Sequence, residues 1–196
     1  MKKSWIILGV IATVILIFIL TSIGSYNTMV AKDEAVTAKW AQVENVYQRR
    51  ADLIPNLVEV VKGYAAHEKE TLEGVIEARS KATSTTIDPS KLTPEAIKNF
   101  QAAQDGLSNA LSRLMVVVER YPDLKANQNF LELQAQLEGT ENRIAVERKK
   151  FNEAAQDYNT YIRKFPKNIW ASIFGFEKKA YFESQPGAEK APQVKF

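Results

Sequence analysis

The sequence of 196 residues contains no cysteine and a single histidine, His67. Without cysteine there are no disulfides, no thiolate nucleophiles and no thiolate metal ligands. A metal site at His67 would need two or three further ligands, and no other histidine or cysteine is present to supply them. Neither an EF-hand loop nor a pattern typical of a catalytic triad is present. We therefore predict no cofactor, interpret His67 as a surface or helix-packing residue, and rank an enzyme last among the functional hypotheses.

The sequence also lacks a strong excess of positive charge. Its formal net charge is +3, which falls to +1 once Lys2 and Lys3 are set aside. Nucleic-acid-binding domains usually carry a strongly basic face. We therefore predict no nucleic-acid partner.

Charge is missing altogether over the 28 residues between Lys3 and Lys32. A hydrocarbon core of about 30 Å needs roughly 20 apolar residues in a helix, and residues 4–23 supply them. A cleaved signal peptide is the alternative, because the sequence SIG at 22–24 resembles a cleavage site. The apolar run is longer than a signal peptide requires, and a helical pattern resumes at Tyr26. We favour an uncleaved signal anchor over residues 1–24.

The orientation of this anchor follows from the positive charges beside it. Lys2 and Lys3 form the denser positive flank, whereas Lys32 stands next to Asp33 and Glu34. This asymmetry predicts a cytoplasmic N-terminus, with the bulk of the chain outside the cytoplasm.

The chain after the anchor has a helical pattern in three long segments. Apolar residues recur at three- and four-residue steps over residues 27–79, which predicts a long helix with a kink or a short break at Pro55. Residues 80–93 have no such period and predict a loop. Thr93 is a good N-cap for a second helix that ends near residue 120.

A turn is expected at Tyr121, Pro122 and Asp123, because Pro122 cannot continue the second helix. Asp123 is then a candidate cap for a third helix, which ends near residue 165. We interpret these three residues first as a turn and second as a docking loop for a partner.

Together these patterns predict an all-α protein. A transmembrane helix leads into an antiparallel-type bundle of three long helices and one short helix over residues 25–183. Residues 184–196 hold two prolines and two lysines and are predicted to be disordered. The short helix contains Trp170 and Phe174 beside Lys178 and Lys179. It is either a membrane-surface helix or a cap that closes the core.

The difference in length between the first two helices leaves one apolar stripe without a predicted neighbour. Helix 27–79 would reach about 80 Å, whereas helix 94–120 returns only about 40 Å. The expected turn at 121–122 then lies beside Pro55. The uncovered stripe comprises Val36, Trp40, Val43 and Tyr47. We expect it to pair with a second copy in a parallel coiled coil; a partner protein, or a first helix that breaks and folds back, is the alternative.

The residues around Pro55 are the sharpest candidate site. Arg49 and Asp52 are spaced to pair on a helix surface. Alternatively, Pro55 frees the carbonyl of Ala51, and polar groups of the third helix satisfy it and the neighbouring backbone. The groups we expect there, facing Arg49, Arg50 and Asp52, are Glu141, Asn142 and Arg143. These structural interpretations are favoured over a ligand-binding site.

Several segments of the sequence resemble the LemA family. The match covers about residues 26–183 in the family's order, together with the N-terminal anchor. It rests on the following segments: QRRADLIPNLV at 48–58, KGYAAHE at 62–68, ERYPDLKAN at 119–127, TENRIA at 140–145, GF at 175–176 and YFE at 181–183. The resemblance implies a membrane-anchored helical bundle in the bacterial inner membrane, with no established molecular activity. It also implies an association with small membrane or secreted proteins that carry a TPM domain, and a branch similar to a magnetosome-formation component.

These observations favour a non-enzymatic scaffold or adaptor at the bacterial cell envelope. A sensory or signalling module is the alternative, in which a ligand bound in the bundle shifts the helix that continues the anchor.

Overall fold

The computed structural model describes residues 2–183, and the described residues confirm the all-α fold. The predicted disordered tail, residues 184–196, lies outside them. The elements in chain order are α1 (Lys2–Tyr64), α2 (Lys69–Ser84), a 3-10 turn η1 (Pro89–Lys91), α3 (Pro94–Val118), α4 (Pro122–Lys125), α5 (Gln128–Arg163) and α6 (Lys167–Phe174).

Helix α1 is continuous through Pro55, so of the kink or short break expected at that residue the break is wrong. The helix instead ends at Tyr64, directly after Gly63, whose intrinsic helix propensity is low. A short turn over residues 65–68 connects α1 to α2, which begins at Lys69. The segment predicted as one helix over 27–79 is therefore two helices, and the chain folds back at their junction.

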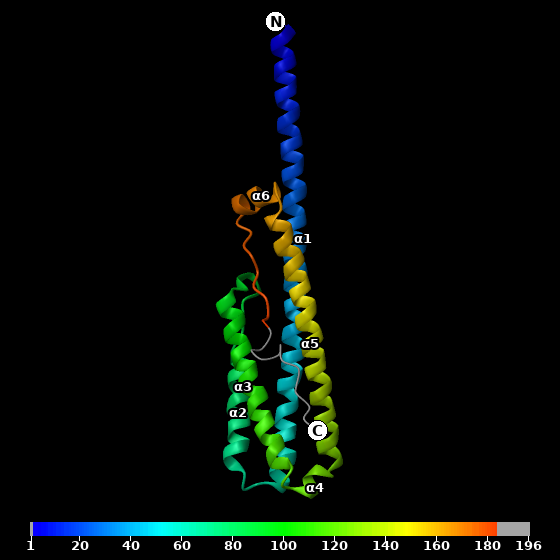
Figure 1. The fold of residues 1–196 in the computed structure, drawn as a ribbon, viewed down its shortest axis with the longest axis vertical. Helices are drawn as coiled ribbons and strands as arrows, with labels where there is room; N and C mark the ends of the chain where they lie inside the picture. The colour runs from blue at the N-terminus through cyan, green and yellow to red at the C-terminus, as the bar shows by residue number, and fades with distance from the viewer. Residues whose placement is uncertain (1, 184–196) are drawn as a thin grey trace, which may run out of the picture.

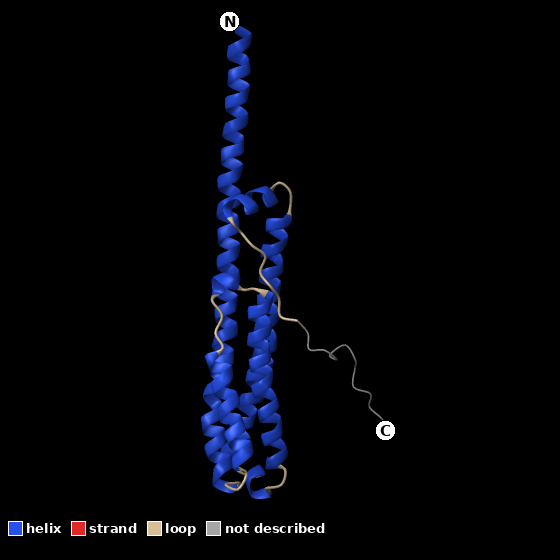
Figure 2. Cartoon of the chain, turned by 90° about the vertical axis from the view of Figure 1, so that its left-hand side faces the viewer, coloured by secondary structure: helices blue, strands red, loops and turns tan. Residues whose placement is uncertain are grey.

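Four helices, α1, α2, α3 and α5, make the distal part of the bundle. Figure 1 shows α1 running away from the N-terminus, α2 returning beside it, α3 running outward again and α5 returning past the ends of α2 and α3. With 36 residues, α5 spans about 54 Å. It therefore lies along α1 from the distal end of the bundle to the point where α1 leaves it (Figures 1 and 2).

The stripe expected to be unpartnered is buried inside the chain. Val36, Trp40 and Val43 have no exposed surface, and Tyr47 is almost fully buried. They pack in one apolar cluster with Phe100 of α3 and with the α5 residues Ile144, Phe151, Ala155 and Tyr158. The premise of the coiled-coil prediction is therefore wrong, because α5 and Phe100 of α3 cover the stripe within the chain.

The segment after α6 closes this part of the core. Gly175 adopts a left-handed conformation, with φ of 75°, and turns the chain back along the bundle. The Phe182 ring then stacks on Trp40, with the ring centroids 5.8 Å apart. The Asn159 side-chain amide donates to the Lys179 carbonyl at 2.8 Å and accepts from the Lys179 N–H at 2.9 Å. Asn152 makes the same pair of bonds to Phe182.

The predicted helix starts are partly correct. The Thr93 hydroxyl accepts from the Ala96 N–H at 3.2 Å, as expected of the N-cap of α3. Helix α5 is capped by Asn127 and not by Asp123. Asp123 lies in the first turn of α4, which separates the end of α3 from the start of α5.

Candidate functional site

Arg50 is the centre of the polar contacts inside the bundle. It lies on α1, and only 2% of its side-chain surface is exposed. Its position is set by the helix period, since Tyr47 and Ile54 on the same face are buried in the core. Burying a guanidinium requires that acceptors surround it.

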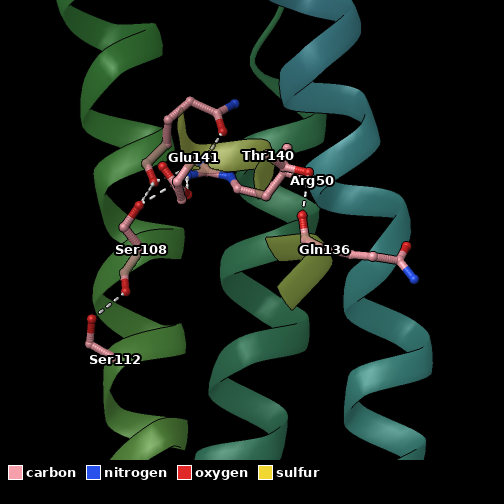
Figure 3. Close-up of polar contacts among 7 residues, drawn as sticks. Arg50, Ser108, Ser112, Gln136, Thr140 and Glu141 are labelled. Atoms are coloured by element: carbon pink, nitrogen blue, oxygen red, sulfur yellow. Dashed lines mark hydrogen bonds and ion pairs between the residues drawn. The ribbon is translucent and has the colours of Figure 1, made fainter. Parts of the chain in front are cut away.

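The acceptors come from two other helices, α3 and α5. Figure 3 shows Arg50 reaching Ser108 of α3 and Glu141 of α5. Nη1 lies 2.6 Å from the Glu141 carboxylate and 3.0 Å from the Ser108 hydroxyl. Nη2 donates to the Gln104 side-chain oxygen at 2.6 Å and to its backbone carbonyl at 3.2 Å. The guanidinium carbon lies 5.1 Å from the Tyr47 ring centroid.

Gln104 extends these contacts to a fourth helix. Its Nε2 donates to the carbonyl of Ala82 on α2 at 3.1 Å. One arginine side chain thus links α1 directly to α3 and α5, and through Gln104 to α2. Because each bond needs its own direction and length, this network specifies how the four helices align. We name these residues, Arg50, Gln104, Ser108 and Glu141, the arginine network.

The carbonyl that Pro55 leaves free has a different partner from the one expected. The Ala51 oxygen accepts from Arg79 Nε at 2.7 Å, across the α1–α2 contact. The prediction that helix three satisfies this carbonyl is therefore wrong. Asn142 and Arg143 are exposed on α5. The physical reason is the fold-back after residue 64, which brings α2 to the side of α1 where Ala51 lies.

The ion pair expected between Arg49 and Asp52 on the surface of α1 is absent from the described residues. Asp52 accepts from the Gln48 side-chain amide at 2.7 Å, one helical turn away. Arg49 is exposed to solvent. Among the four candidate residues at 49–55, Arg50 alone is buried. Pro55 affects the packing of α1 on α2 indirectly, because it leaves the Ala51 carbonyl free to accept from Arg79.

The bond between Arg79 and Ala51 predicts a coupled pair of substitutions. We expect Arg79→Ala to lower the free energy of unfolding by about 1–2 kcal/mol, because a part-buried carbonyl loses its donor. In a Pro55→Ala background residue 55 regains an N–H that can bond the same carbonyl, so Arg79→Ala should cost much less. Denaturant unfolding of the four variants measures the coupling. Equal costs in both backgrounds would contradict this assignment.

A small pocket lies beside the arginine network. Its volume is about 70 Å³, and its walls include Glu44, Tyr47, Thr83, Phe100 and Gln104. Burial raises the pKa of Glu44, and the Trp40 indole, which is near but outside hydrogen-bonding geometry, partly offsets this. Burial also raises the pKa of Tyr47, and the positive charges of Arg148 and Arg50 partly offset this increase. Pockets that hold metabolites measure roughly 300–1,000 Å³, so this one is too small for them.

No group of three or more potential metal-ligating side chains occurs within the described part of the chain. His67 is exposed in the turn between α1 and α2.

The turn predicted at residues 121–123 lies at the distal end of the bundle. The Tyr121 hydroxyl bonds the Glu68 carboxylate at 3.2 Å, and Arg120 lies 3.1 Å from the same carboxylate. The expectation that this turn lies beside Pro55 is therefore wrong, because α1 ends nine residues after Pro55 and the turn packs against that end. Pro122 and Asp123 are exposed at the surface.

Helix α6 lies at the opposite end of the bundle. Trp170 and Ala171 are buried in the same cluster as Trp40, whereas Phe174 is exposed. The inner face of α6 therefore closes the core, as one of the two interpretations expected. Lys179, predicted to stand beside an apolar stripe, is buried and lies 2.8 Å from the Asp33 carboxylate.

Sequence reasoning missed Gln104, Ser108 and Arg79 as members of this site. Gln104 falls four residues after Phe100 and three before Leu107, in the apolar seam of α3. A polar side chain in such a seam indicates a buried polar partner, and this signal could have identified Gln104. Arg79 gives no comparable signal, since its role depends on where the chain folds back.

Comparisons with known proteins agree with the resemblance noted in the sequence. The family model of the LemA family matches residues 39–196. Magnetosome protein MamQ 2 of Paramagnetospirillum magneticum is 33% identical over 189 residues, covering 88% of this chain and 70% of that protein. Protein LemA of Metamycoplasma hominis is 26% identical over 183 residues, covering 93% of this chain and 80% of that protein. The chain therefore belongs to the LemA family.

Proposed function

We propose that this chain is a membrane-anchored, non-catalytic scaffold or adaptor whose bundle stands outside the cytoplasm of a bacterial cell. The observation that carries the proposal is α1 itself. Its first part is apolar and exposed from Trp5 to Ile23, and the same helix continues into the centre of the bundle. The large apolar side chains of this stretch are 48–72% exposed, and its length suits a bilayer.

The interior of the bundle supports a structural role. The arginine network joins helices to one another, with Arg50 directed at groups of the protein itself. The pocket beside it is too small for a metabolite, so this part of the interior supports a structural role rather than a ligand site. The relatives from Paramagnetospirillum magneticum and Magnetospirillum gryphiswaldense are named as magnetosome proteins, and these names state no reaction.

The orientation rests on Lys2 and Lys3 as the positive flank of the span. We expect a reporter that is active only outside the cytoplasm to be active when it is fused after Phe196. A cytoplasmic reporter at the same place should be silent, and replacing both lysines by glutamate should weaken or invert the insertion. The opposite pattern of reporter activity would show that the bundle is cytoplasmic.

The scaffold role is tested by photo-crosslinking in intact cells. Photoreactive residues at exposed positions on three faces of the bundle, Ile76, Val116 and Val146, should capture discrete partners identified by mass spectrometry. Membrane proteins with a TPM domain are the first class to seek. The same probe at buried Leu107 should give only contacts within the chain. Absence of adducts at every exposed position would argue against a scaffold.

A further inference from the structure

Helix α6 lies across α1 at the point where α1 leaves the bundle (Figures 1 and 2). Two ring contacts define the crossing. The Trp170 ring centroid lies 4.6 Å from that of Phe18, and the Phe174 centroid lies 5.0 Å from that of Tyr26. Helix α6 is thereby packed against the part of α1 that runs from residue 18 to residue 26.

This part of α1 belongs to the uncharged run between Lys3 and Lys32. From Trp5 to Tyr26 an α-helix rises about 31 Å, close to the thickness of a hydrocarbon core. Phe18 is then inside the apolar layer and Tyr26 is at its boundary. Because Trp170 touches Phe18, α6 lies at the level where the bilayer meets water. Tyr26, Trp170 and Phe174 form the kind of aromatic group that is enriched at this level.

The outer face of α6 is apolar and exposed. Ile173 is 64% exposed and Ile169 is 47% exposed, while Phe165, directly before the helix, is 81% exposed. These side chains add an apolar surface to the one that the span already presents. The fold thus places two exposed apolar surfaces side by side at one end of the bundle.

Basic side chains flank this surface. Arg163, Lys164 and Lys178 are exposed, and the Lys167 ammonium lies 3.9 Å from the Tyr161 ring centroid. Two nearby carboxylates already have cationic partners, since Asp157 pairs with Lys32 and Asp33 with Lys179. Long basic side chains beside an apolar helix can reach lipid phosphates while their stems stay on apolar surface.

We propose that α6 is a lipid-surface helix, a second membrane contact that lies in the interfacial layer on the bundle's side of the bilayer. Phe165, Ile169 and Ile173 enter the acyl-chain boundary, and the flanking cations meet the headgroup phosphates. The inner face of α6 still closes the core, so both interpretations of the short helix apply, one to each face. This proposal rests on the membrane anchor proposed above. Its consequence is that the bundle is held at a set height and angle on the membrane.

The absence of cysteine allows a clean test with single spin labels. The full chain is reconstituted in phosphatidylcholine vesicles with phosphatidylglycerol, carrying one cysteine at Phe165 or Ile173. Controls are a label at Val14 in the span and a label at Val116, which is 68% exposed on α3 near its distal end. We expect a severalfold higher ratio of oxygen to nickel-chelate collisions at Phe165 and Ile173 than at Val116.

The controls separate the two proposals. If Val14 is in lipid while Phe165 and Ile173 match Val116, the surface helix is wrong and the anchor stands. If Val14 itself is exposed to water, the anchor fails. Ile169→Glu should return a label at Phe165 to water, because a charge then faces the acyl chains. The matched change Val146→Glu, on exposed surface of α5, should leave that label unchanged.

Discussion

Replacing Trp40 by alanine is expected to lower the free energy of unfolding of the bundle by about 3–5 kcal/mol. Trp40 has no exposed surface, and its ring contacts Phe100 of α3, Phe151 of α5 and Phe182 of the closing segment. Truncation would leave a cavity where three parts of the chain meet. Denaturant unfolding of the full chain in detergent, followed by circular dichroism, measures the loss.

Trp5→Ala is the matched control for this change. Trp5 is on the same helix but is exposed, in the apolar span, so its loss should leave the unfolding of the bundle unchanged. Burial within one chain also predicts a transition midpoint that does not depend on protein concentration. A midpoint that rises with concentration would restore the idea that a second copy covers this stripe.

The second large effect is expected at Arg50. We expect Arg50→Ala to lower the free energy of unfolding by about 3 kcal/mol, because the buried Gln104 and the part-buried Ser108 lose their donor and a cavity opens. The value falls at the low end for a broken buried ion pair, since the half-exposed Glu141 can be rehydrated. The neighbouring Arg49 is exposed, and Arg49→Ala should change stability by less than about 0.5 kcal/mol.

Arg50→Lys separates charge from geometry. Lysine keeps the positive charge but cannot bond Glu141 and Gln104 at once with a planar fork, so it should recover only part of the loss. Full recovery would mean that the charge alone matters. Equal losses for Arg49→Ala and Arg50→Ala would show that the network does not hold the bundle together.

The helical class of this protein was predictable because it depends on local pattern. The spacing of apolar residues identified α3 and most of α5, and Thr93 with Pro94 marked the start of α3. The uncharged run identified the apolar part of α1. Each of these features follows from the helix period, from capping or from the thickness of a bilayer, and none requires a distant contact.

The ends of α1 and α2 were harder to predict. Proline has a very low helix propensity, because it removes a backbone hydrogen bond inside the helix. The free-energy cost of Pro55 is reduced when another group donates to the carbonyl that it leaves free. Arg79, which lies 28 residues after Ala51 in the sequence, donates this hydrogen bond. The weaker signal at Gly63 therefore marks the end of the helix. The competition between the two sites is decided by the packing of α2, which the local sequence does not contain.

By itself the sequence determined most of the helical segments, the part that can span a membrane, the apolar faces that pack in a core, and the membership of the LemA family. The tertiary structure alone decided what each apolar face packs against. It covered Trp40 with α5 and the closing segment, paired Arg50 with Glu141, and set Trp170 against Phe18. The helix period specifies the direction of a side chain along its own helix, but the partner depends on where the chain turns back and how far each helix extends.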